Sequence, residues 1–157
     1  MSISKSFKVY LICISFFSLF GIKSYAQNDF DKPVLSSITI SPTNIDLSSG
    51  NVTITVTLQA SDTSGIATPS TSQSGAYISH SAIVGGQQWF SSWELIDGDQ
   101  YNGTYKSYKS IEASKVPSGD YDINIQANQI IDNAGNIANN LPAQQITVVN
   151  NASQYIY

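Results

Sequence analysis

Short runs in which apolar and polar residues alternate recur along the chain after residue 33. The clearest run is residues 51–60 (NVTITVTLQA), where apolar residues alternate with threonines. Successive side chains of a β-strand point to opposite faces, so this run predicts a strand with one buried and one wet face. Residues 120–129 (DYDINIQANQ) and 144–150 (QQITVVN) show the same period. No stretch shows a convincing helical period of 3.6 residues, so the pattern indicates an all-β domain.

Four further segments complete the set of about seven expected strands. They are VLSSITIS at 34–41, AYISHSAIV at 76–84, QQWFSSWELI at 87–96 and GTYKSYKSIEAS at 103–114. The links between them are rich in Gly, Pro, Asn, Asp and Ser, and they leave no room for a crossover helix. The sequence therefore predicts antiparallel pairing in a β-sandwich or barrel.

The first 26 residues have the three zones of a signal peptide. A basic stretch at residues 1–8 is followed by an uncharged apolar run at residues 9–20 and then by GIKSYA. The apolar run is too short for a bilayer core, which needs about 20 helical residues. Ser24 and Ala26 form the small-x-small pattern that a signal peptidase accepts. We expect cleavage after Ala26, and the alternatives are a retained membrane anchor or a buried N-terminal helix.

This division sets the expected domain layout and location. A protein with a cleaved signal peptide is exported, so we expect it to be secreted or displayed on the extracellular surface, or to stay in a periplasm, with no membrane insertion after cleavage. The expected parts are a signal peptide at 1–26, a lead-in at 27–32, one domain at 33–150 and a tail at 151–157.

Charge and cysteine content narrow the possible partners. Loss of residues 1–26 removes three of the seven lysines and leaves no arginine, while all 11 acidic residues remain. Binding to nucleic acid or to an anionic membrane requires clustered basic residues, so neither partner is expected. Cys13 leaves with the signal peptide, so no disulfide is expected and stability depends on core burial.

An ordered set of turn motifs resembles a known class of modules. ASDTSG after a strand, a DG-containing hairpin leading into GTY, and PSGDY before a strand that ends near DNAGN occur in this order. Together, over about residues 31–149, they are similar to the bacterial immunoglobulin-like and cadherin-like modules of secreted enzymes and surface adhesins. The resemblance implies an immunoglobulin-like, seven-strand antiparallel β-sandwich without catalysis. It also implies an adhesive or structural role, with a cell-surface protein or glycan as partner, and calcium ligands in many cadherin-like relatives.

PSGDY can also be explained by local geometry. Gly119 offers the turn and Tyr121 starts a strand, as in the tyrosine corner of such sandwiches.

Acidic residues gather at one end of the expected sandwich. In an antiparallel chain the links alternate between the two ends, which places most aspartates at the end where the chain enters. Ca²⁺ takes oxygen ligands from carboxylates and amides, and a cation would relieve the repulsion between these acids. The hypothesis is a calcium site at Asp31, Asp62, Asp132 and Asn136, and a second candidate is the hairpin with Asp97 and Asp99.

The alternative for these residues is turn chemistry. Asp and Asn in turns commonly accept hydrogen bonds from their own backbone with no metal present. DNAGN in particular could be a turn with Gly135 at positive φ.

The aromatic segment QQWFSSWELI allows two interpretations. In a strand, Trp89 and Trp93 lie on one side and Phe90 on the other. An open Trp pair, with Tyr105 on the next strand, would suit stacking on sugar rings, so a carbohydrate-binding module is the alternative function. The other interpretation is that both Trp side chains fill the core, which a domain without disulfides needs.

Catalytic residue types are scarce after residue 26. His80 is the single histidine and lies in an expected strand, with no nucleophile motif beside it. We therefore do not expect an enzyme.

Overall fold

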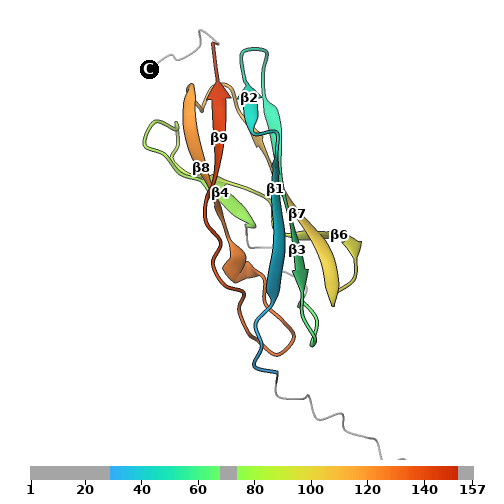
Figure 1. Ribbon diagram of the computed structural model, residues 1–157. Coiled ribbons are helices and arrows are strands. Elements are labelled where there is room, and N and C mark those ends of the chain that lie inside the picture. Colours follow the sequence, from blue (N-terminus) through green and yellow to red (C-terminus); the bar gives the residue numbers. More distant parts are fainter. Residues whose placement is uncertain (1–28, 68–73, 152–157) are drawn as a thin grey trace, which may run out of the picture.

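The computed structural model describes residues 29–67 and 74–151, which form two β-sheets packed face to face (Figure 1). The expected signal peptide at 1–26 and the tail after residue 151 lie outside the described residues. The strands are β1 (Val34–Ser41), β2 (Asn44–Asp46), β3 (Val52–Ser61), β4 (Ala76–Ile78), β5 (Gln88–Trp89), β6 (Glu94–Gly98), β7 (Asn102–Ile111), β8 (Gly119–Ile125) and β9 (Gln144–Val149). The described part also contains one 3₁₀ turn, η1 (Ala127–Gln129), and no helix long and apolar enough to cross a membrane.

The order of the strands is that of an immunoglobulin-type sandwich. The first sheet has the order β1-β3-β7-β6 and the second has the order β2-β9-β8-β4-β5. In an immunoglobulin domain the first, second, fifth and fourth strands form one sheet, and the third, sixth and seventh form the other. The same order appears here when the short strands β2 and β5 are left out of the count, with β1, β3, β7 and β6 in one sheet and β4, β8 and β9 in the other. The prediction of an all-β sandwich is confirmed.

Three details differ from the prediction. β2 and β9 pair in parallel through Ile45 and Val148, so the pairing is not antiparallel throughout. The strand expected at 76–84 is paired only over β4, and a loop follows it. The strand expected at 87–96 is wrong, because β5 belongs to the second sheet and β6 to the first.

The chain crosses between the sheets at Ser91. The Ser91 N–H donates to the Tyr108 carbonyl of β7 (2.8 Å), and the Ser91 carbonyl accepts from the Gly75 N–H (2.7 Å). The aromatic segment is therefore two short strands joined by a crossing.

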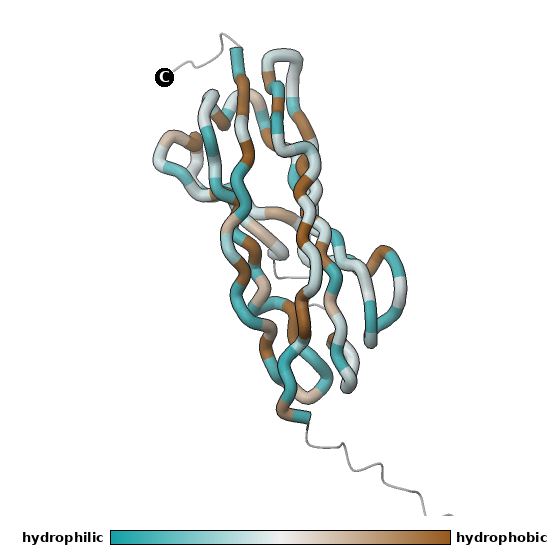
Figure 2. Tube along the Cα trace, viewed as in Figure 1, coloured by the Kyte–Doolittle hydropathy of each residue, from teal (hydrophilic) through white to brown (hydrophobic). Residues whose placement is uncertain are grey.

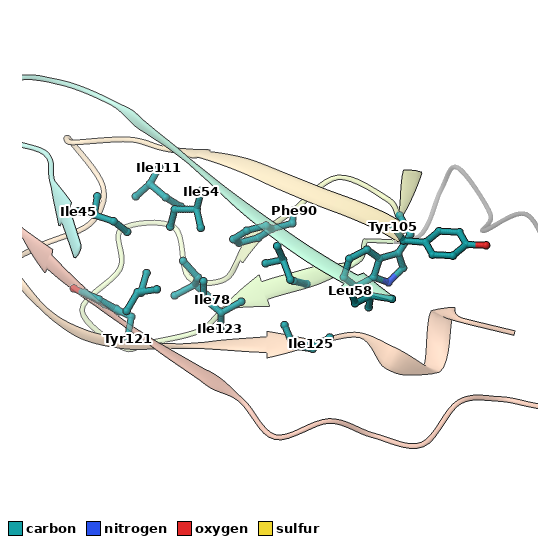
Figure 3. Close-up of a cluster of buried hydrophobic side chains, with 14 of the residues drawn as sticks. Ile45, Ile54, Leu58, Ile78, Phe90, Tyr105, Ile111, Tyr121, Ile123 and Ile125 are labelled. Atoms are coloured by element: carbon teal, nitrogen blue, oxygen red, sulfur yellow. The ribbon is translucent and has the colours of Figure 1, made fainter. Parts of the chain in front are cut away.

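The inward residues of both sheets form one core. Ile54, Val56 and Leu58 of β3 are buried against Ile123 of β8 and Ile146 of β9. Figure 3 shows Ile54, Leu58 and Ile123 between the two layers, and Figure 2 shows apolar positions interrupting the polar ones along the strands. Burial of an aliphatic side chain contributes about 1.5–3 kcal/mol, so this alternation is the main cause of the fold.

The turn before β8 is a tyrosine corner. The Tyr121 hydroxyl donates to the Pro117 carbonyl at 2.8 Å, and the Tyr121 ring is buried. The corner expected from PSGDY is confirmed, and it fixes the end of the sandwich opposite to the chain entry.

Candidate metal centre at the entry end

Three segments that are far apart in the sequence meet where the chain enters β1. They are the lead-in from residue 29, the loop after β3 and the loop after η1, at the lower end of Figure 1. Ile66 and Asp132 form an antiparallel bridge between the two loops. The Asn133 N–H also donates to the Gly65 carbonyl at 2.8 Å, so the loops form one unit.

One carboxylate from each segment points into this junction. Asp29, Asp62 and Asp132 each bring an oxygen within 4.8 Å of the other two. Asp132 is only 2% exposed, and the other two side chains are half-buried. A site made from three separate segments can link them through a common ligand.

Asp132 is held by its own loop. Its Oδ1 accepts from the Ala134 and Asn136 N–H groups, at 2.9 and 2.7 Å. Gly135 has φ +93°, as expected for this turn, and its N–H donates to the Asp132 carbonyl at 3.2 Å. The tight loop fixes the direction of the buried carboxylate.

Asn136 joins Asp132 to the lead-in. Its amide nitrogen donates to Asp132 Oδ2 at 2.7 Å and to the Asp29 carbonyl at 2.9 Å. Asn136 therefore belongs to the junction as predicted, but it faces the two aspartates with its donor group. Asn136 was expected to offer its side-chain oxygen to a cation, but its contacts with Asp29 and Asp132 are made by the amide nitrogen.

Asp29 and Asp62 accept hydrogen bonds around the junction. Asp29 accepts from the Asp31 N–H (3.0 Å) and the Thr63 hydroxyl (3.3 Å), and Asp62 Oδ1 accepts from the Ser64 N–H and hydroxyl at 2.8 and 2.7 Å. The Asp31 N–H is the main cause that lowers the pKa of the Asp29 carboxyl. Burial opposes this, and the side chains of Ser64, Thr63 and Asp62 lower the pKa further. Asp29 is thus ionised at neutral pH.

No basic side chain neutralises this cluster within the described ranges. Their two ion pairs are Glu94–Lys106 and Glu112–Lys115, both elsewhere. Lys32, the nearest lysine in sequence, donates to Asn139 Oδ1 at 3.1 Å. Carboxylates this close repel one another unless water or a cation compensates their charge.

The arrangement suits a hard cation such as Ca²⁺. Each carboxylate offers about four acceptor positions, so the hydrogen bonds described above leave lone pairs free. Ca²⁺ takes six to eight oxygens, including waters. A cleft of about 670 Å³ adjoins the cluster through Asp62 and Thr63 and opens it to solvent. The cleft is lined by Asp31, Lys32, Val34, Ser61, Asp62, Thr63 and Tyr101.

The structure brings together only part of the predicted calcium ligands. Asp62 and Asp132 lie in the cluster, whereas Asp31 lines the cleft and Asp29 stands where Asp31 was expected. Both acids lie in the motif NDFD of the lead-in. The assignment of successive loops to alternate ends of the sandwich could identify this segment. It could not show which of the two aspartates in the segment points into the cluster.

The second candidate, the hairpin between β6 and β7, has the geometry of a turn. Asp99 Oδ1 accepts from the N–H groups of Tyr101 and Asn102, at 2.8 and 3.0 Å. Asp97 lies on the edge strand and pairs in register with Thr104. Neither belongs to the group of converging carboxylates among the described residues.

The Trp pair of the alternative function is separated. Trp93 is 3% exposed, and its indole N–H donates to the Gln126 carbonyl at 3.4 Å. A Cβ added at Gly75 would lie 2.9 Å from the Trp93 ring, which shows how tightly the ring is packed. Trp89 is 49% exposed on the other sheet, and the Tyr105 side chain is buried. The alternative platform of Trp89, Trp93 and Tyr105 is therefore wrong, and the core interpretation holds for Trp93 but not for Trp89. The reason is that the chain crosses between the sheets inside the segment.

His80 takes part in a turn and a ring contact. Its Nδ1 accepts from the Ala82 N–H at 3.1 Å, and its ring meets Tyr121 edge-on with centroids 5.3 Å apart. These contacts give His80 a structural role.

Comparison of the chain with known protein families, curated proteins and solved structures finds no match. Fold and site together define a two-sheet β-sandwich with three converging carboxylates at its entry end.

Proposed function

We propose that the protein is a non-catalytic, exported immunoglobulin-like module in which Ca²⁺ fastens the lead-in segment to the sandwich. The observation that carries the proposal is the convergence of Asp29, Asp62 and Asp132 from three segments, without a lysine among them. Its role is adhesive or structural, with a cell-surface protein or glycan as partner.

The position of the cluster supports a mechanical role for the ion. Asp62 and Asp132 belong to loops that are already joined by backbone hydrogen bonds. Asp29 is held to them by side-chain contacts and by the Asn136 amide. A cation shared by the three carboxylates would add a strong link at the point where the lead-in meets the domain.

Compartment and charge support Ca²⁺ in particular. An exported acidic domain meets Ca²⁺ outside the cell, and carboxylate oxygens are hard ligands of the kind that Ca²⁺ prefers. An ion that binds only the folded state stabilises it by about 2.7 kcal/mol when its concentration is 100 times Kd.

Thermal unfolding of the Asp62→Asn variant tests the proposal, because the difference in Tm between the variant and the unaltered protein should change sign between chelator and Ca²⁺. The Asn side chain keeps an oxygen that can accept the Ser64 hydrogen bonds, so mainly the charge is lost. In chelator we expect the Tm of the variant to exceed that of the unaltered protein by about 2 to 4 °C, because repulsion in the cluster is relieved. In millimolar Ca²⁺ we expect the order to reverse, because the site with one negative charge fewer binds Ca²⁺ more weakly.

Asp120→Asn is the matched control at the opposite end. Asp120 accepts from the Thr147 hydroxyl at 2.7 Å, and an Asn oxygen can accept the same bond. Its Tm should respond to Ca²⁺ as the unaltered protein does. An unaltered protein whose Tm is the same in Ca²⁺ and in chelator would overturn the proposal.

A further inference from the structure

An aromatic pair lies on the outer face of the second sheet. Tyr77 of β4 and Trp89 of β5 are direct partners in the register, and their ring centroids are 5.0 Å apart at an interplanar angle of 44°. The flanking Ala76 and Ile78 are fully buried, so Tyr77 points away from the core. Trp89 is 49% exposed, so part of its ring is open to a ligand on this face.

Polar groups continue this row across the sheet. Asn124 of β8 is the register partner of Tyr77 on its other side, and Asp122 follows two residues away on the same face. The side chains of Asn124 and Asp122 make no hydrogen bond to another described residue. Neighbouring strands are about 4.8 Å apart, so the amide lies beside Tyr77 and two strands from Trp89, with its donor and acceptor groups available.

The charge of this face excludes anionic ligands. Asp120 and Asp122 lie on it, while Lys106 and Lys109 belong to β7 in the other sheet. A quaternary ammonium ligand would favour rings that enclose it, whereas these two rings lie on an open sheet. An uncharged sugar ring has an apolar C–H face and a rim of hydroxyl groups, which fits rings beside an amide and a carboxylate.

We propose that Tyr77 and Trp89 stack on uncharged sugar rings of a polysaccharide, and that Asn124 and Asp122 hydrogen-bond to their hydroxyl groups. The site is built from other residues than the predicted Trp pair. It does not rest on the calcium proposal, because it lies on a sheet face and shares no residue with the carboxylate cluster.

Fluorescence titration of the full-length chain tests this proposal. The two Trp residues differ in exposure, 49% for Trp89 and 3% for Trp93, so a stacking ligand should change mainly the Trp89 emission. The probes are hexamers of β-1,4-linked glucose, β-1,4-linked N-acetylglucosamine, β-1,4-linked xylose and α-1,4-linked glucose, with choline as the cationic comparison ligand. We expect saturable binding of at least one neutral hexamer, unchanged in chelator, and no binding of choline.

Variants assign the binding to this face. Trp89→Ala should weaken binding about tenfold or more, Trp89→Phe should weaken it about threefold or less, and Asn124→Ala should weaken it severalfold. Tyr108→Ala is the control, because Tyr108 is 47% exposed and pairs with Thr55 in the other sheet. Binding of no hexamer, or equal affinity in Trp89→Ala and the unaltered chain, would overturn the proposal. If the Tm did not respond to Ca²⁺, the calcium proposal would fail, but the proposal of a sugar-binding face would still stand.

Discussion

Acidic residues occupy both ends of the sandwich, but the two ends neutralise them in different ways. At the end opposite to the chain entry, Asp46 accepts from the Ser48 N–H at 2.8 Å and Glu112 pairs with Lys115 at 2.8 Å. At the entry end, carboxylates from three segments converge and no lysine joins them. At both ends carboxylates accept hydrogen bonds from their own turns. Only at the entry end do carboxylates from three segments also converge, so that their remaining lone pairs can share one ligand. The arrangement, and not the residue type, separates the two ends.

Hydrogen bonds between uncharged groups also hold the loops at the opposite end together. The buried Asn150 amide donates to the carbonyls of Ala113 and Val116, at 2.7 and 2.8 Å, and Tyr121 donates to Pro117. This end needs no ion for its structure. We therefore expect Ca²⁺ to change the stability of the entry end alone.

The largest effect should come from Asp132→Ala. The substitution leaves the N–H groups of Ala134 and Asn136 without their acceptor at a site that is 2% exposed. Hydrogen bonds to a charged group contribute about 1.5–3 kcal/mol each, and relief of repulsion in the cluster offsets part of the loss, so we expect a net loss of about 3 kcal/mol in urea unfolding. Asp120→Ala, at an exposed position of the opposite end, should cost about 0.5 kcal/mol or less. Equal losses at the two positions would remove the contrast between the ends.

Tyr121→Phe should have a smaller effect, and one that does not depend on Ca²⁺. The variant keeps the buried ring and loses the hydrogen bond from the hydroxyl to the Pro117 carbonyl. We expect a loss of about 1 kcal/mol in the free energy of unfolding, the same with Ca²⁺ and with chelator. A loss that depends on Ca²⁺ would mean that the two ends are coupled.

The smallest expected effect is the response to acid. The pKa of Asp46 is lowered by hydrogen bonds from the Ser48 side chain and backbone, and that of Glu112 mainly by the hydrogen bond from Lys115. The pKa of Asp29 is also lowered. These three acids therefore stabilise the fold at a pH above their pKa values in the unfolded chain. This stabilisation is lost as the pH falls through their lower pKa values in the folded protein.

In chelator, melting curves should therefore show stability that is constant near pH 6 and falls below about pH 4. With Ca²⁺ the fall should begin at higher pH, because protons compete with the ion for the carboxylates. Identical pH profiles with Ca²⁺ and chelator would contradict this.

Regular alternation made much of the fold predictable. β1 coincides with the predicted strand, and β3 begins and ends within one residue of its prediction, because apolar and polar residues alternate along it. β2 was missed because a strand of three residues with only Ile45 buried has no readable period. Phe90 and Trp93 are both buried although an uninterrupted strand would place them on opposite faces. A crossing between sheets depends on tertiary packing, and the alternation of apolar and polar residues along a segment carries no information about it.

The candidate site was predictable to the level of segments. Counting links placed Asp62 and Asp132 at one end, and the structure brings them together. The choice of Asp29 over Asp31 depends on the path of the lead-in, in which the Asp31 N–H turns back to the Asp29 carboxylate. The orientation of the Asn136 amide depends in turn on Asp29 and Asp132.

Calorimetric titration of the full-length chain with CaCl₂ measures whether the carboxylate cluster binds Ca²⁺. We expect a saturable heat with one ion per chain, absent in the double variant Asp29→Asn/Asp62→Asn and retained in Asp120→Asn. No heat with the unaltered chain, or the same heat with the double variant, would contradict it.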